Sequence, residues 1–200
     1  MNGLELCAKI KNNIEYSHIP VILLTAKVLP EAKVEGFSYG ADAYVEKPFT
    51  ILQLHMQIRN LLKLRTTFQQ HMTSFLPDAK PEEKEEEETG IQLTPQDQEF
   101  IKKMQEIIEQ QLADEGFSID TLASEMNMSR SNFYRKLKAL SGMPPNDYLK
   151  NCRLNKAAQL LKEGYRVTEV FERTGFGSSS YFAKCFKAKF GVLPKDYISN

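Results

Sequence analysis

The C-terminal part of the chain contains an internal repeat, which constrains its fold more than any other feature. Between Thr121 and Ile198 the sequence matches itself at an offset of 49 residues. Eight residues of the first copy have identical partners in the second: Ser131, Phe133, Lys138, Ala139, Gly142, Pro145, Asp147 and Tyr148 match Ser180, Phe182, Lys187, Ala188, Gly191, Pro194, Asp196 and Tyr197. Such self-similarity indicates two copies of one supersecondary unit.

Each copy is expected to fold as a short helix, a turn and a second helix, the pattern of a helix-turn-helix. Ser129 and Ser178 are expected to cap the second helices, and Gly175 permits a tight turn in the second copy. Several apolar residues recur at helical spacing and are predicted to face the core: Phe133, Leu137 and Leu140 in the first copy, and Phe182, Phe186 and Phe190 in the second.

The opposite side of each second helix carries basic, hydroxyl and tyrosine side chains, which can donate to phosphates and base edges. The predicted DNA contacts are Arg130, Ser131, Tyr134, Arg135 and Lys138 in the first copy, and Ser179, Ser180, Tyr181, Lys184 and Lys187 in the second. A helix expected over 145–162 is about 25 Å long at the rise of an α-helix. It can hold two recognition helices about one DNA turn, near 34 Å, apart.

The net charge of zero conceals two segments of opposite charge. Residues 116–200 have 14 Lys and Arg against 7 Asp and Glu, whereas residues 78–88 have 7 acidic residues against 2 lysines. A basic domain behind an acidic segment favours a polyanionic partner, although a solvated basic surface would have the same composition. The repeat favours the first interpretation.

The cysteines Cys7, Cys152 and Cys185 are widely spaced, and no His clusters with them. Neither a zinc site nor a disulfide framework is predicted, which favours a cytoplasmic location. No apolar run approaches the length of a membrane span, and Met1 does not begin a signal peptide.

Residues 1–73 alternate between helix and strand, which indicates an α/β sheet. The expected elements, in order, are a helix from Gly3 to Lys11, a strand over 21–24, a helix from Pro30 to Gly40, a strand over 43–45 and a long helix capped by Thr50. Two strands form only part of a sheet. The predicted fold class is therefore mixed, a truncated α/β unit followed by an all-α domain.

The long helix has apolar residues at heptad a and d positions, interrupted by Arg65: Ile51, Leu54, Ile58, Leu61, Phe68, Met72 and Phe75. Two alternatives are open. The helix over 51–75 forms a dimeric coiled coil, or its first half packs on its own sheet.

Residues 74–93 are predicted to be a flexible linker, because the acidic run lacks apolar residues and repels itself. Thr94 and Pro95 then restart structure as an N-cap and first helical residue. The helix that follows is expected to end at Gly116. Its apolar face consists of Phe100, Met104, Ile107, Ile108 and Leu112.

Residues 98–200 resemble the AraC-type DNA-binding domain. The most specific matches are Arg153 to Leu161 (RLNKAAQLL), Val167 to Val170, Gly175-Phe176, Ser180 to Phe182, Phe186-Lys187, Phe190-Gly191 and Pro194 to Tyr197. The resemblance implies an all-α domain over 94–200 that binds double-stranded DNA as a monomer through two helix-turn-helix units. It also implies RNA polymerase as a partner.

One residue departs from this pattern. The family usually has a small Ala where this chain has Phe171, which corresponds to Ala123 in the first copy. Two helices cross closely at that position. Phe171 must therefore either reshape the crossing or point partly outward.

Residues 1–73 resemble the C-terminal half of a response-regulator receiver domain. The matching segments are Met1-Asn2-Gly3, Ile19 to Ala26, Gly36, Gly40 to Tyr44 and Glu46 to Phe49. The resemblance implies that Thr25 and Lys47, at the ends of two strands, contact a phosphoryl group, with Tyr44 as the switch residue. It also implies a cis bond between Lys47 and Pro48.

The acidic residues that such a domain uses to bind Mg²⁺ and accept a phosphoryl group would precede Met1. No phosphoacceptor, metal ligand or cofactor is therefore predicted within the chain, because Asp42 precedes a strand and reads as a turn residue. We expect either that the chain is a fragment of a larger regulator or that its receiver remnant is a dimerising or vestigial piece. The larger regulator could be a hybrid sensor kinase or a free-standing response regulator, and the sequence leaves both alternatives open.

The leading hypothesis is a sequence-specific DNA-binding transcription regulator that forms the output portion of a two-component protein. The alternative is a protein-interaction module in which residues 1–73 dimerise and DNA binding is weak or lost. An enzyme is not predicted, because His18, His55 and His71 are isolated and no nucleophile-base pair or glycine-rich phosphate loop is visible.

Overall fold

The computed structural model describes residues 1–26, 39–74 and 93–197. The chain divides into two compact units, one formed by Met1–Gln69 with Glu85–Lys102 and the other by Gln70–Lys84 with Lys103–Asn200. The division falls within two helices, α3 (Ile51–Ser74) and α4 (Pro95–Gln111).

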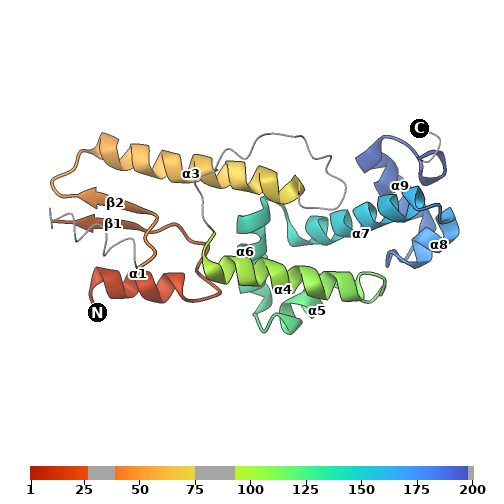
Figure 1. Cartoon of the computed structure of the whole chain (residues 1–200), viewed down its shortest axis with the longest axis horizontal. Helices are drawn as coiled ribbons and strands as arrows, with labels where there is room; N and C mark the ends of the chain where they lie inside the picture. The colour runs from red at the N-terminus through yellow and green to blue at the C-terminus, as the bar shows by residue number, and fades with distance from the viewer. Residues whose placement is uncertain (27–38, 75–92, 198–200) are drawn as a thin grey trace. The chain divides into compact units, whose positions relative to one another are not determined.

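Unit 1 contains α1 (Gly3–Lys11), β1 (Ile22–Thr25), β2 (Ala43–Glu46) and α3 (Ile51–Ser74, through Gln69). The two strands pair in parallel, with Ile22 opposite Ala43 and Thr25 opposite Glu46. Figure 1 shows the strands drawn between α1 and α3. The helix predicted from Pro30 to Gly40 lies mostly outside the described residues.

Local capping explains where these helices begin. The Asn2 side chain accepts a hydrogen bond from the Glu5 backbone N–H (2.8 Å), and the Glu5 carboxylate accepts one from the Asn2 backbone N–H (3.1 Å), which forms a capping box. Thr50 accepts from the Gln53 N–H (3.2 Å) at the start of α3, as predicted. The strand predicted over 21–24 lies one residue later in the structure, at Ile22–Thr25.

A buried lysine holds unit 1 together, and the sequence pattern did not reveal it. Lys11, only 5% exposed, donates through Nζ to the carbonyl oxygen of Ile19 (2.9 Å) and pairs with Asp42 (2.6 Å). Asp42 also accepts from the backbone N–H of Val21 (2.6 Å). Asp42 therefore joins α1 to both strand entries, which agrees with its predicted role as a turn residue.

The first turns of α4 also belong to unit 1. Thr94 accepts from the Asp97 N–H (3.1 Å), which confirms the predicted N-cap. The Asp97 carboxylate in turn accepts from the hydroxyl of Ser17 (2.8 Å), and both residues are buried. Further along α4, Phe100 is fully buried.

The apolar pattern of α3 is only partly buried. Leu54 and Leu61 are half-buried, whereas Ile51 and Ile58 are exposed. Phe75 lies outside the described residues, as do the side chains of Phe68 and Met72. The coiled coil therefore stays a prediction.

Unit 2 is helical. After α4 it contains α5 (Ile119–Glu125), α6 (Arg130–Ser141), α7 (Pro145–Lys162), α8 (Val167–Glu172), α9 (Ser179–Phe190) and the 3-10 helix η1 (Pro194–Asp196). The parallel strand pair followed by this helical domain confirms the predicted fold class. Helix α4 ends at Gln111 rather than at Gly116, because the Asp114 carboxylate accepts from the Gly116 N–H (2.8 Å) and turns the chain.

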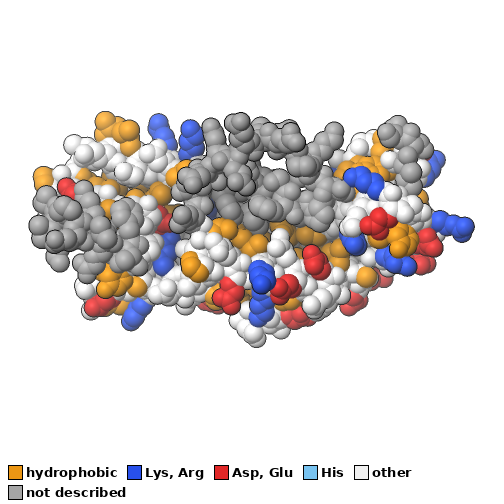
Figure 2. Space-filling model, in the orientation of Figure 1, with side chains coloured by type: hydrophobic (Ala, Val, Ile, Leu, Met, Phe, Trp, Pro, Cys, Tyr) orange, Lys and Arg blue, Asp and Glu red, His pale blue; other side chains and the backbone are white. Residues whose placement is uncertain are grey.

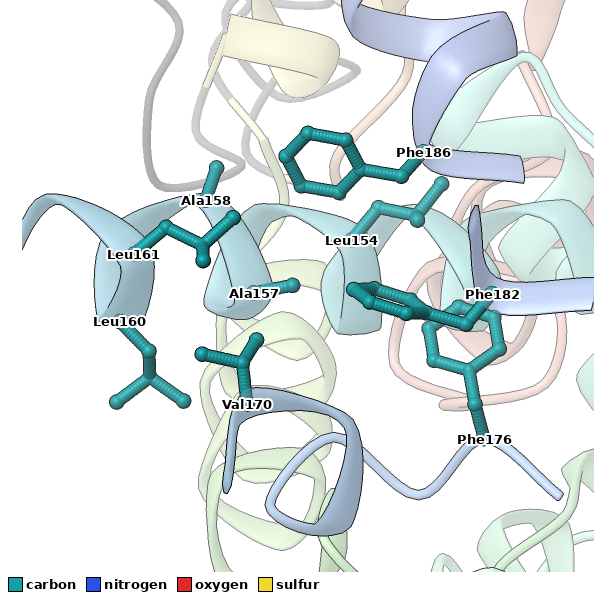
Figure 3. Close-up of a cluster of buried hydrophobic side chains, with 9 residues drawn as sticks. All are labelled: Leu154, Ala157, Ala158, Leu160, Leu161, Val170, Phe176, Phe182 and Phe186. Atoms are coloured by element: carbon teal, nitrogen blue, oxygen red, sulfur yellow. The ribbon is translucent and has the colours of Figure 1, made fainter. Parts of the chain in front are cut away.

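A cluster of buried hydrophobic side chains surrounds the second half of α7 (Figure 3). In it Leu154, Ala157 and Leu161 from α7 meet Val170 from α8 and Phe182 from α9, each at most 1% exposed. Phe182 and Phe186 are in edge contact, with ring centroids 5.7 Å apart. The predicted apolar stripe of α9 is thus core, although Phe190 is only half-buried.

Candidate nucleic-acid interface

The first helix-turn-helix consists of α5, a short turn and α6. Asn127 has a left-handed backbone conformation (φ 54°) in the turn, and the Ser129 hydroxyl accepts from the Asn132 N–H (3.3 Å) to cap α6. Phe133 and Leu137 are fully buried beneath α6. This buried face determines which side of α6 is exposed.

The second helix-turn-helix consists of α8, a longer turn and α9. Gly175 has the left-handed conformation (φ 64°), and the Ser178 hydroxyl accepts from the Tyr181 N–H (3.4 Å). Asn127 precedes its cap by two positions and Gly175 by three, so the second turn has one extra residue. The supporting helices therefore correspond at an offset of 48, and Phe171 occupies the position of Ala123.

All ten predicted DNA contacts are exposed in the structure. They lie on two helices of one helical unit: Arg130, Ser131, Tyr134, Arg135 and Lys138 on α6, and Ser179, Ser180, Tyr181, Lys184 and Lys187 on α9. Figure 2 shows Lys and Arg side chains next to acidic ones over α8 and α9.

Some of these side chains already have local partners. The Arg130 guanidinium pairs with Asp120 (2.9 Å), and both are exposed. Arg135 donates to the Asn132 side chain. Because exposed ion pairs contribute little energy, a phosphate can compete with Asp120 for Arg130. The partner of Arg135 is a neutral amide, which does not compensate its positive charge.

A small polar cluster connects α7 to the exposed face of α9. A hydrogen bond with Cys185 raises the pKa of Tyr181, and the nearby Lys150 charge opposes this rise. Lys150 pairs with Asp147 (2.6 Å), and that contact raises the pKa of Lys150. The N-terminal part of α7 therefore lies beside the surface of the second recognition helix.

The repeated residues divide into surface and structural positions. Gly142 and Gly191 both end a recognition helix with positive φ (75° and 81°), which favours glycine. Tyr148 is buried, and Tyr197 packs edge-on against Phe186 with centroids 5.2 Å apart. Much of the repeat therefore encodes the fold, not the DNA contacts.

Three basic residues have structural contacts that the sequence did not reveal. Lys136 is fully buried in α6. Lys189 donates to the Asn155 side chain and to the Asn151 carbonyl oxygen (3.4 Å), which ties α9 to α7. Arg153 donates to backbone carbonyls between α4 and α5.

The four residues assigned to the receiver lie at or near the ends of the strand pair. The Lys47 N–H donates to the Thr25 carbonyl oxygen (2.6 Å), and the Lys47–Pro48 bond is cis. Thr25 and Tyr44 are half-buried, whereas Lys47 and Pro48 are exposed. In the part of the chain that the structure describes, no three His, Cys, Asp or Glu residues are grouped so as to hold a metal ion.

Comparison with known protein families tests the two predicted resemblances. Residues 122–200 match a family described as "Helix-turn-helix domain", and residues 1–59 match "Response regulator receiver domain". The C-terminal unit contains an AraC-type helix-turn-helix domain. It follows part of a receiver domain, so the predicted resemblance is confirmed.

The similarity to one named relative extends over both parts of this chain. Histidine kinase P4 of Formosa agariphila is 35% identical over 198 residues, which cover 98% of this chain and 14% of that protein. The regulator MtrA of Neisseria gonorrhoeae is 32% identical over 117 residues, 58% of this chain and 38% of that protein. The chain thus spans well under half the length of these relatives.

Two solved structures are similar to the AraC-type domain. The C-terminal domain of the response regulator yesN from Fusobacterium nucleatum is 30% identical and covers 50% of this chain and 98% of its own, with a TM-score of 0.47. The DNA-binding domain of AdpA, in complex with a target DNA, is 30% identical over 50% of this chain and 89% of its own, with a TM-score of 0.46. Among the described helices, none is long and apolar enough to cross a membrane.

Proposed function

We propose that this chain is the output portion of a two-component signalling protein and acts as a sequence-specific DNA-binding transcription regulator. The observation that carries the proposal is the pair of capped helices α6 and α9, each with its apolar face buried and a basic, hydroxyl-rich face exposed. An exposed face of this composition suits phosphates and base edges of the major groove.

The geometry of α7 supports a single two-part site. The helix has 18 residues, which corresponds to about 27 Å, and both helix-turn-helix units pack on it. A spacer of this length is comparable to the separation of successive major-groove segments, about 34 Å. One chain can then contact two segments on one face of a duplex.

The test is a selection of binding sites from random-sequence DNA with the full chain, followed by affinity measurements over a salt series. Because phosphate contacts release counterions, the logarithm of affinity should fall linearly with the logarithm of salt concentration. Undetectable binding, or affinity that does not respond to salt, would refute the proposal.

We also propose that the chain belongs to a longer hybrid kinase rather than to a free-standing regulator. The support is the 35% identity to histidine kinase P4, which extends over 98% of this chain, including its receiver part. The coding sequence upstream of Met1 tests this: an open frame that encodes the remaining receiver and a kinase is expected. A frame with a stop codon shortly before a complete receiver would favour the free-standing form.

Two protein partners follow as proposals. RNA polymerase is one, because a relative of the C-terminal domain, 36% identical over 78 residues, is named as the transcriptional activator RhaS. A shift of the protein–DNA complex on adding purified polymerase would support it, and no shift at any polymerase concentration would oppose it.

Self-association is the other, and a specific observation favours it. Hydrophobic side chains at the start of α3 are exposed (Figure 2): Ile51, Leu52 and Met56 are 76%, 69% and 57% exposed. Apolar groups this exposed in one region favour association. Sedimentation of the full chain should show a concentration-dependent dimer that Leu52→Lys abolishes. A monomer at all concentrations would rule this out.

A further inference from the structure

The loop that precedes the first helix-turn-helix lies directly against the turn of the second. We define the entry loop as residues 112–118, between α4 and α5, and the second turn as residues 174–178. A Cβ on Gly175 would overlap the Leu112 carbonyl oxygen and lie 3.0 Å from that of Asp114. A Cβ on Gly177 would overlap the Glu115 carboxylate. The two glycines allow this close approach.

Arg153 of α7 lies at the same contact. Its Nη2 donates to the carbonyl oxygens of Asp114 (3.0 Å) and Phe117 (2.9 Å), so one guanidinium nitrogen holds both ends of the entry-loop bend. Its Nε is buried, makes no hydrogen bond within the described residues, and lies 3.1 Å from the ideal Cβ position of Gly175. Arg153 therefore contacts the entry loop and the second turn together.

The pKa of Arg153 is consistent with a half-buried guanidinium that contacts other parts of the fold. Burial lowers the pKa of Arg153, while the nearby carboxylates of Asp114 and Glu115 oppose this effect. Arg is suited to this place because its planar fork presents several donors in fixed directions, whereas Lys presents one compact ammonium group. The guanidinium remains charged, since arginine does not deprotonate in proteins.

Both recognition helices depend on the segments that meet at Arg153. The entry loop leads into α5, whose N-cap Ser118 follows Phe117 directly, and α5 packs on α6. The second turn ends at Ser178, the N-cap of α9. A displacement of the entry loop against the second turn would therefore move one recognition helix relative to the other.

We propose that Arg153 is a positioning residue that sets the relative placement of α6 and α9, and thereby the spacing between two DNA half-sites that one chain can bind together. This inference rests on the proposed DNA-binding function and extends it. Arg153 itself makes no base contact in this scheme.

The test measures the affinity of the full chain for a set of duplexes in which the two selected half-sites are separated by different numbers of base pairs. The wild type should bind best at one spacing. Arg153→Gln should flatten this profile, with a loss of about tenfold at the best spacing, comparable to the loss of one good base contact. Affinity for a duplex with one half-site should stay within about twofold, because each helix keeps its own contacts.

Lys156→Gln is the matched control, since Lys156 lies one turn along α7 and contacts only Gln159 among the hydrogen bonds described. It should keep the wild-type profile. Arg153→Lys, which retains the charge and the aliphatic stem, should give an intermediate profile and provides a second variant if Arg153→Gln does not fold by circular dichroism.

The outcomes are distinct. A uniform loss at all spacings with the optimum retained would mean that Arg153 supports stability only, and would overturn the inference. An unchanged profile would overturn it too. If the wild type binds no DNA at all, the proposed function fails and the inference falls with it.

Discussion

The ring of Phe171 packs against the ring of Phe182, with centroids 6.2 Å apart and planes inclined by 46°. Phe182 is 1% exposed, whereas Phe171 is only half-buried and lies at the edge of the core cluster. Of the two outcomes expected for Phe171, the structure shows the second: the side chain points partly outward. The buried contact of α8 is made instead by Val170, which is fully buried.

This arrangement predicts unequal costs for the two truncations. Phe182→Ala should lower the free energy of unfolding by about 3–5 kcal/mol, since it leaves a cavity in the core. Phe171→Ala should cost about 1–2 kcal/mol, because less apolar area is removed from contact. Native-state hydrogen exchange of α7 amides measures both. Equal costs would show that Phe171 is as deeply packed as Phe182.

A second prediction concerns two glycines with positive φ. Gly175 (φ 64°) meets the entry loop, while Gly164 (φ 90°) has open space where a Cβ would be. Gly164→Ala should cost about 1 kcal/mol from backbone strain alone. Gly175→Ala should cost about 3 kcal/mol or more, because it adds an overlap with backbone atoms. Equal thermal shifts for the two variants would contradict the close contact with Leu112.

The recognition helices predict specific losses of DNA binding. Arg135→Ala and Lys184→Ala should each weaken binding to the selected site by about tenfold and relax specificity if they contact bases. Lys103→Ala, which makes the same charge change at an exposed position on α4, is the control and should have little effect. Equal losses in all three variants would point to net charge rather than to these two helices.

Removal of the ion pair between Asp120 and Arg130 is expected to raise the affinity for DNA. Asp120→Asn removes a negative charge beside the first recognition helix and frees Arg130 for phosphate. Affinity for DNA should rise about threefold at low salt and less at high salt. Stability should hardly change, because exposed pairs contribute at most about 1 kcal/mol. A drop in affinity would show that Asp120 orients Arg130 for binding.

Unit 2 should lose stability at alkaline pH. Burial, and after it the charge of Cys152, raises the pKa of the Tyr148 phenol, and burial raises the pKa of the Cys152 thiol to about 12. An acidic group whose pKa is higher in the folded protein than in the unfolded chain stabilises the fold fully at a pH below its unfolded pKa. That pKa is about 10 for Tyr and about 8.5 for Cys, and the contribution to the free energy of unfolding is lost as the pH rises above it. Melting temperature should therefore fall between about pH 9 and 12.

Tyr148→Phe tests this assignment, since it removes one of the two titrating groups and keeps the ring. The variant should show a smaller fall in melting temperature over the same pH range than the wild type. Parallel curves for the two proteins would exclude Tyr148 as a source of the alkaline loss.

The local pattern of the chain predicted most helix boundaries. Ser129 and Ser178 cap the recognition helices as expected, and Gly142 and Gly191 end them. These features are local, because a cap or a left-handed residue acts within one turn of its own helix. The exposed faces of α6 and α9 followed from the positions of their apolar residues.

Residues whose partners lie far away in the sequence could not be assigned in this way. Lys11, Arg153 and Lys189 join α1 to a strand entry, α7 to the entry loop and α9 to α7, and no local pattern in the sequence predicts these contacts. A cation satisfied by distant backbone carbonyls leaves no periodic signal, since its acceptors are present in every residue.

The sequence by itself determined the element order, the two helix-turn-helix units and the faces that each recognition helix exposes, because apolar spacing and capping residues act locally. Only the tertiary structure decided that Phe171 lies at the edge of the core, and that Gly175 and Arg153 meet the entry loop. These outcomes depend on how segments that are distant in the sequence pack together. Because protein interiors are close-packed, the space that one segment leaves limits which side chains the other can have there.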